Sequence, residues 1–207
     1  NDLSPEKIYA NIGLGDGGSD VSSSEGEPNN MASFFGRAGY NFKDRYLTSF
    51  TLRADGSSKF GPGNKWGYFP SFAAAWRISE EPFMADTKKY ISDMKLRASY
   101  GEAGNNRISS GLYKLDYRIS STGTYAIGDK PNNYYQPRNN QLPNPDIRWE
   151  SLVTKNIGLD FGLFNQRIFG TVEYYWNTSS DLLLDLKITA PGYSSMMKNI
   201  GQTTNKG

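Results

Sequence analysis

The stretch LRASYGEAGNN, residues 96–106, decides the fold class of this chain. Leu96, Ala98 and Tyr100 alternate with polar residues, and a period of two places the two sets on opposite faces of a β-strand. At Gly101 the alternation stops and a long polar tract begins, so we expect the strand to end there. A strand of a soluble sheet fits this pattern, and so does a strand that crosses a membrane and emerges on its far side.

The composition leaves both classes open. The chain has 207 residues, is 37% hydrophobic and has a mean hydropathy of −0.64, which a membrane β-barrel also shows because its lipid-facing and lumen-facing residues alternate. No stretch approaches the roughly 18 to 20 consecutive apolar residues of a spanning helix, and the N-terminus has no basic-then-apolar leader. The net charge of +2 is too small to indicate nucleic acid or anionic lipid as the main partner. Without Cys or His the chain lacks thiolate and imidazole chemistry and the usual zinc ligands, so we expect no enzyme activity, no cofactor and no metal.

Alternation predicts about six strands. The connection after the third begins with Ser79, a candidate helix N-cap, and Glu80 and Glu81 are expected to stabilise a short helix there rather than to act as an acid–base pair. The long tract 102–148 is rich in Asn, Ser, Gly and Pro, although YKLDYRI (113–119) is compatible with a strand. The expected strands are residues 32–42, 46–55, 71–78, 94–100, 156–163 and 168–177.

The connections between the expected strands are alternately short and long. In an up-and-down sheet alternate connections lie at opposite ends, so the short ones share one end and the long ones share the other. The long ones, residues 56–65, 102–148 and 178–198, share one end, as the external loops of outer-membrane barrels do. We therefore predict an all-β fold, an antiparallel up-and-down transmembrane β-barrel segment that leaves the bilayer at Gly101. A soluble β-sandwich with a buried aromatic core is the alternative. The aromatic residues expected at the membrane interfaces are Trp66, Trp149 and Trp176 at the long-loop end, and Tyr40, Phe42, Tyr46, Trp76, Phe161 and Phe164 at the other.

Several runs also resemble one family. These are RADGSSKFGPGNKWGYFPSFAAAWRISEEPFM (53–84), MKLRASYGEAGNN (94–106), NPDIRWES (144–151), NIGLDFGLFNQRIFGTVEYYWNTSSDLLL (156–184) and NIGQTTNKG (199–207). They closely resemble the barrel of SusC/RagA-type TonB-dependent transporters of the Bacteroidetes outer membrane. The resemblance implies a large plugged barrel of about 22 strands, of which residues 31–207 are an internal fragment without plug or TonB box. Residues 1–30 match no motif of this family; they end in a cluster of Gly, Ser, Asp and Asn, and we expect them to form an extracellular loop.

The resemblance also implies a function and partners. It implies TonB-dependent active import of a nutrient oligomer, glycan or peptide, across the bacterial outer membrane, with a SusD-like surface lipoprotein as lid and TonB acting through the plug. An adhesin or structural barrel that binds without transporting is an alternative from another class. A soluble carbohydrate-binding sandwich is a third.

Candidate binding residues follow from the expected faces and loops. Each charged residue of the polar face has two interpretations: it contacts substrate, or it is only a hydrated or paired part of the wall. The loop tyrosines likewise either stack on a sugar or peptide or only order the loop. GLGDGG (13–18) has no helix after it and does not indicate a nucleotide site, and Asp16, Asp20, Glu25 and Glu27 lack the regular spacing of a calcium loop. The lumen-facing candidates are Arg37, Arg53, Arg97, Asp160 and Glu173, and the external-loop candidates are Tyr113, Tyr117, Tyr125, Tyr134 and Tyr135.

Overall fold

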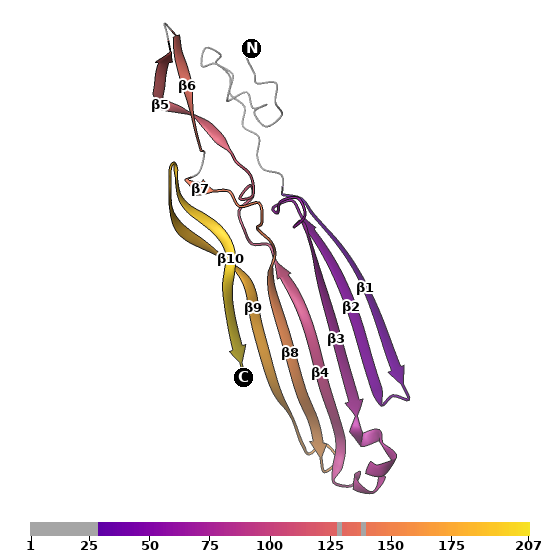
Figure 1. Ribbon diagram of the computed structural model, residues 1–207. Helices are drawn as coiled ribbons and strands as arrows, with labels where there is room; N and C mark the ends of the chain where they lie inside the picture. Colours follow the sequence, from indigo (N-terminus) through magenta and orange to yellow (C-terminus); the bar gives the residue numbers. More distant parts are fainter. Residues whose placement is uncertain (1–28, 128–129, 138–139) are drawn as a thin grey trace.

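One open sheet dominates the structure. The computed structural model describes residues 29–127, 130–137 and 140–207 (Figure 1). Within them, eight strands form a sheet in the order β1-β2-β3-β4-β8-β9-β10-β7, and β5 pairs with β6 in a separate hairpin. Neighbours in the large sheet are antiparallel except β7, which runs parallel to β10. The strands are β1 Met31–Phe42, β2 Tyr46–Ser57, β3 Trp66–Arg77, β4 Ile91–Asn105, β5 Tyr117–Ile127, β6 Lys130–Pro137, β7 Gln141–Leu142, β8 Glu150–Leu163, β9 Ile168–Ala190 and β10 Tyr193–Lys206.

The cross-strand register assigns the two faces of the sheet. Arg97 on β4 lies opposite Gly158 on β8, which lies opposite Glu173 on β9, so these three share one face. The neighbouring row contains Leu96 and Leu159 and points to the other side, because successive side chains of a strand alternate. We call the first the polar face and the second the apolar face. The predicted alternation is confirmed.

The apolar face carries large hydrophobic side chains that remain exposed. No second sheet covers this face within the described residues, and the β5–β6 hairpin lies beyond one end of the strands (Figure 1). A soluble sandwich buries such a surface, so that alternative is wrong; an outward band of this kind is typical of a barrel wall in lipid. The exposed residues of this face include Phe34, Tyr40, Phe42, Tyr46, Phe50, Leu52, Trp66, Tyr68, Phe72, Ile157, Ile168, Val172 and Tyr174.

The strand count of about six was too low. β9 continues through the expected loop 178–198 as far as Ala190, and a turn at 191–192 leads into β10. Alternation hides this hairpin because Leu182, Leu183 and Leu184 are consecutive and Asp181 has a positive φ of 55°. Register shifts in the β9–β10 pairing also break the period of two. The β9–β10 hairpin still extends at the end of the sheet where the long connections lie (Figure 1).

The expected strand end at Gly101 was also wrong. Gly101 is paired with Thr154, and β4 continues four residues further to Asn105. Polar residues remain in the strand because they find partners on β8: the hydroxyl of Ser151 donates to Glu102 Oε1 over 2.7 Å, and the amide of Asn105 donates to a carboxylate oxygen of Glu150. Cross-strand polar pairs of this kind compensate for the missing apolar contacts.

Two short 3-10 helices, η3 Ile78–Glu80 and η4 Pro82–Thr87, form the expected helical connection, but not with the expected caps. Ser79 lies inside η3 and its hydroxyl donates to Asp93. The Glu81 carboxylate caps no helix; it accepts hydrogen bonds from Tyr46 Oη at 2.6 Å and Trp76 Nε1 at 3.0 Å. These two hydrogen bonds, of which the one from Tyr46 has the larger effect, lower the pKa of Glu81 below its ordinary value of 4.5.

None of the helices among the described residues has the length and apolar character needed to cross a membrane.

The other end of the sheet is closed over by connecting segments. Phe60, Phe69, Ile147 and Trp149 form a buried cluster, with the Phe60 and Trp149 ring centroids 5.0 Å apart. Trp149 is only 7% exposed, so its expected place in an interfacial girdle was wrong. Trp66 and Trp176 do lie on the apolar face, as predicted. The loops therefore pack on one another and on Phe69 of β3, and they build the only large apolar core of the described residues.

Candidate functional site: the polar face

A charged network spans three strands of the polar face. The Arg97 guanidinium donates two hydrogen bonds to the Asp160 carboxylate, each of 2.9 Å, and a third of 2.6 Å to Glu173. The Lys95 ammonium lies 3.0 Å from Asp160, and the Thr171 hydroxyl donates to the same carboxylate. Three of the predicted site residues therefore meet at one place. Two cations face two carboxylates, so the cluster is close to neutral.

Gly158 makes room for this network. A β-carbon at position 158 would lie 3.2 Å from both Arg97 Nη2 and Glu173 Cγ, so the ion pair crosses directly over the glycine. Gly158, Lys95 and Thr171 were not among the predicted site residues. The signal for Lys95 was present, because it stands two residues before Arg97 and a period of two places both on one face. Gly158 and Thr171 require the register between strands, which alternation does not supply.

Arg53 and Arg37 lie apart from that network. Arg53 Nε donates to both carboxylate oxygens of Asp55, at 2.8 and 2.7 Å, within the same strand. Asp55 is 5% exposed, so this pair forms part of the wall near the loop end. Arg37, on the edge strand β1, is exposed and has no ion pair with any described residue. Within the described residues, three of the five lumen candidates therefore form one network, Arg53 is paired within its own strand, and Arg37 has no ion pair.

A shallow hollow of about 460 Å³ lies on the polar face with Arg37 and Arg97 in its lining. Its floor is made of small side chains contributed by four adjacent strands, which leaves space above the backbone. An arginine with free donors beside such a surface can bind a carboxylate or a sugar hydroxyl. The floor and wall residues include Gly39, Asn41, Ser49, Ala73, Ala75, Ser99 and Asn156.

The predicted loop tyrosines are only partly described. The Tyr113 ring lies 3.4 Å from where a β-carbon of Gly61 would be, so it packs against the 58–65 connection. Tyr117 begins β5 near Tyr193, the first residue of β10. Burial, followed by the effect of Tyr117, raises the pKa of the Tyr193 hydroxyl. The side chains of Tyr125, Tyr134 and Tyr135 lie outside the described residues, as do residues 1–28 with the expected extracellular loop and the acidic residues considered for calcium. The described residues contain no cluster of three or more acidic side chains that would hold a metal ion.

The fold and the two faces define a class: a segment of the wall of an antiparallel membrane β-barrel. The sheet is open in this segment. Comparison with known proteins supports this class and identifies the family. The model of the TonB-dependent receptor-like β-barrel family matches residues 4–207. The chain therefore belongs to the TonB-dependent receptor β-barrel family, whose members are outer-membrane proteins, and the predicted SusC/RagA-type recognition is confirmed.

Individual relatives are similar over most of this chain. The chain is 39% identical over 178 residues to TonB-dependent receptor P26 of Formosa agariphila and 38% identical over 183 residues to TonB-dependent receptor SusC of Bacteroides thetaiotaomicron. Each match covers 86% of this chain but only 17% and 18% of those relatives. The RagAB peptide importer in its open-open state superposes with a TM-score of 0.72 at 28% identity, over 85% of this chain and 18% of that one. The chain thus spans less than a fifth of the length of each of these three relatives.

Proposed function

We propose that this chain forms part of the barrel of a TonB-dependent importer that carries a nutrient oligomer, a glycan or a peptide, across the outer membrane. Family membership and the similarity to SusC and to the RagAB peptide importer support this proposal. TonB would act through a plug, and a SusD-like surface lipoprotein would cover the loop end as a lid. The polar face is then the lumen wall along which the oligomer passes.

The observation that carries the proposal is the hollow beside Arg37. The other charges of the lumen candidates are paired: Arg97 with Asp160 and Glu173, and Arg53 with Asp55. Paired charges keep the wall polar without binding a passing solute tightly. Arg37 has free donors next to the small side chains of the hollow, so it is the lumen candidate best suited to contact substrate.

Import and simple adhesion are separated by one experiment on the full-length receptor in its own cells. Fluorescent oligomers of defined glycans and peptides are supplied to cells with and without the receptor gene, and then to cells that also lack TonB. An importer gives accumulation that requires both proteins, with surface binding retained when TonB is absent. Surface binding without TonB-dependent accumulation of any oligomer would refute import and favour an adhesin.

The substitution Arg37→Ala tests the lumen contact itself. A charge-assisted hydrogen bond contributes about 1.5 to 3 kcal/mol, so the half-saturation concentration for uptake should rise about tenfold or more. Arg167→Ala is the matched control, because Arg167 is exposed in the short turn between β8 and β9. Equal uptake by both variants at equal surface levels would show that Arg37 does not contact the substrate. Arg37→Lys should recover part of the loss.

A further inference from the structure

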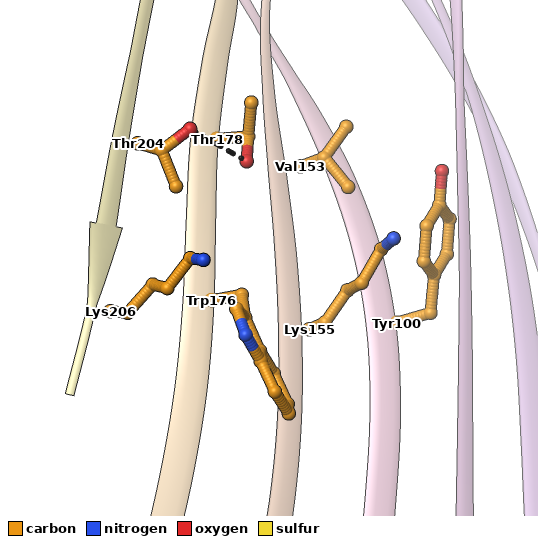
Figure 2. A pocket seen from close by; sticks show the side chains of 7 residues that line it. All are labelled: Tyr100, Val153, Lys155, Trp176, Thr178, Thr204 and Lys206. Atoms are coloured by element: carbon orange, nitrogen blue, oxygen red, sulfur yellow. Dashed lines mark hydrogen bonds between the residues drawn. The ribbon is translucent and has the colours of Figure 1, made fainter.

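A second hollow lies on the apolar face, on the opposite side of the sheet from Arg37 and the charged network. It has a volume of about 750 Å³ and spans β4, β8, β9 and β10 (Figure 2). The cross-strand register places Tyr100, Lys155, Trp176 and Lys206 side by side in one row. The next row contains Glu102, Val153, Thr178 and Thr204, and the two threonine hydroxyls are 3.4 Å apart.

Charged side chains are few on this face. Along β1, β2, β3, β8 and β9, the side chains that share the face of Leu96 and Leu159 are apolar, aromatic, small or hydroxylic, apart from Lys155. On β4 the same face carries the Glu102 carboxylate, which lies opposite Val153 and accepts a hydrogen bond from the Ser151 hydroxyl. Neither Lys155 nor Lys206 forms an ion pair with another described residue, and both are exposed. A cation on a lipid-facing surface is costly near the middle of the bilayer and is tolerated near its edge, where anionic headgroups lie.

The height of the hollow fits the headgroup level. Ile168 begins β9 at the short-turn end, and Trp176 stands eight residues further along the same face. At about 3.3 Å per residue this is roughly 26 Å along the strand, or about 20 Å across the membrane for a strand tilted by about 40°. An outward apolar band is about 25 Å tall, so with Ile168 at its lower edge Trp176 lies within about 5 Å of its upper edge. In Figure 2 the Lys206 side chain rises from the Trp176 row on the side of the two threonines, whereas the Lys155 side chain rises on the side of Val153 and Tyr100.

We propose that Lys155, Lys206, Thr178 and Thr204 bind a phosphate group of lipid A, the phosphorylated anchor of the outer leaflet, on the outer wall of the barrel. Adjacent strands are about 4.8 Å apart, so the two lysine backbones are roughly 10 Å apart and their flexible chains can close on one phosphate from two sides. The paired hydroxyls supply neutral donors above them. Trp176 and Tyr100 line the apolar part of the hollow, against which an acyl chain can pack.

The test uses the full-length receptor purified in a mild detergent and analysed for bound lipid A by native mass spectrometry. The double substitution K155Q/K206Q removes both charges and keeps the chain lengths. Each lost charge-assisted contact should weaken binding about tenfold, so bound lipid A should fall by at least tenfold. The matched control is K187Q/K198Q, which removes two exposed lysines from the same β9–β10 hairpin closer to its tip and should leave binding unchanged.

Lipid source and phosphate specificity are resolved by competition. Lipid A that retains its phosphates should displace the bound lipid from the wild-type receptor, whereas dephosphorylated lipid A and millimolar inorganic phosphate should not. Displacement by inorganic phosphate alone would show a general anion site and overturn the assignment to lipid. Equal lipid A retention by wild type and K155Q/K206Q, or equal loss in the two double variants, would show that these lysines only extend to the interface without forming a site.

Discussion

Replacement of Leu96 by Arg gives the sharpest test of which face meets lipid. Leu96 lies on the apolar face in register with Trp76 and Leu159. It is four residues before Tyr100, which lies in the row of Trp176 near the upper edge of the apolar band. Four residues cover about 13 Å along the strand and about 10 Å across a membrane at a tilt of about 40°. Half of a 25 Å band is about 12.5 Å, so Leu96 lies within about 3 Å of the middle.

At that depth an arginine on the lipid face costs about 2 to 4 kcal/mol. The matched control is Tyr68→Arg, since Tyr68 is exposed on the same face near the loop end of β3, where the cost falls to about 0 to 1 kcal/mol. The free energy of unfolding is measured by urea titration of the full-length receptor refolded in lipid vesicles. A cost for Leu96→Arg below about 1 kcal/mol, or no larger than that of the control, would refute the face assignment.

Cysteine labelling checks the same assignment without relying on stability. This segment has no cysteine of its own, so single cysteines at 96 and 97 report their surroundings directly. A lipid-soluble maleimide should modify Leu96→Cys and spare Arg97→Cys, while a charged maleimide that enters the lumen should do the reverse. The opposite pattern would shift the register by one residue and exchange the two faces.

Three further predictions follow from packing and charge. A β-carbon at Gly104 would overlap the buried Phe69 ring, so Gly104→Ala should cost about 1 to 3 kcal/mol in urea unfolding, and the added Phe69→Leu substitution should recover part of that cost. The pKa of Glu81 is lowered in the fold, so the stabilising effect of its carboxylate is complete above pH 4.5 and is lost as the pH falls through the lower folded value. Proteolysis at the short-turn end should therefore increase in acid for the wild type. Glu81→Gln should show no such pH dependence. Replacement of residues 118–137 by a short Gly/Ser linker should leave barrel assembly intact and impair uptake or lid association; normal growth on the cognate oligomer with normal lipoprotein co-purification would assign this segment no part in capture.

The faces could be predicted from the sequence because they depend only on a period of two. Leu96 and Arg97 were assigned to opposite sides correctly without any knowledge of their neighbours. The partners of Arg97 could not be predicted, because β4 and β8 are separated by a long connection and their register is set by its packing rather than by local sequence. The β9–β10 hairpin was missed for another reason: consecutive leucines and register shifts remove the periodic signal where the strands extend beyond the apolar band.

In both proposals the pairing of charges separates the wall of the sheet from its binding surfaces. Lys95, Arg97 and Arg53 each have a carboxylate partner, and two opposed charges in contact present little field to a solute. Unpaired cations behave differently, because their donors remain available and no intramolecular bond has to break before a ligand binds. Among the described residues, Arg37 on the polar face and Lys155 and Lys206 on the apolar face have no ion-pair partner and are cations of this kind. Since the sheet separates them, a substrate on one side and a lipid phosphate on the other can be bound independently, and substitutions at one surface should leave the other unchanged.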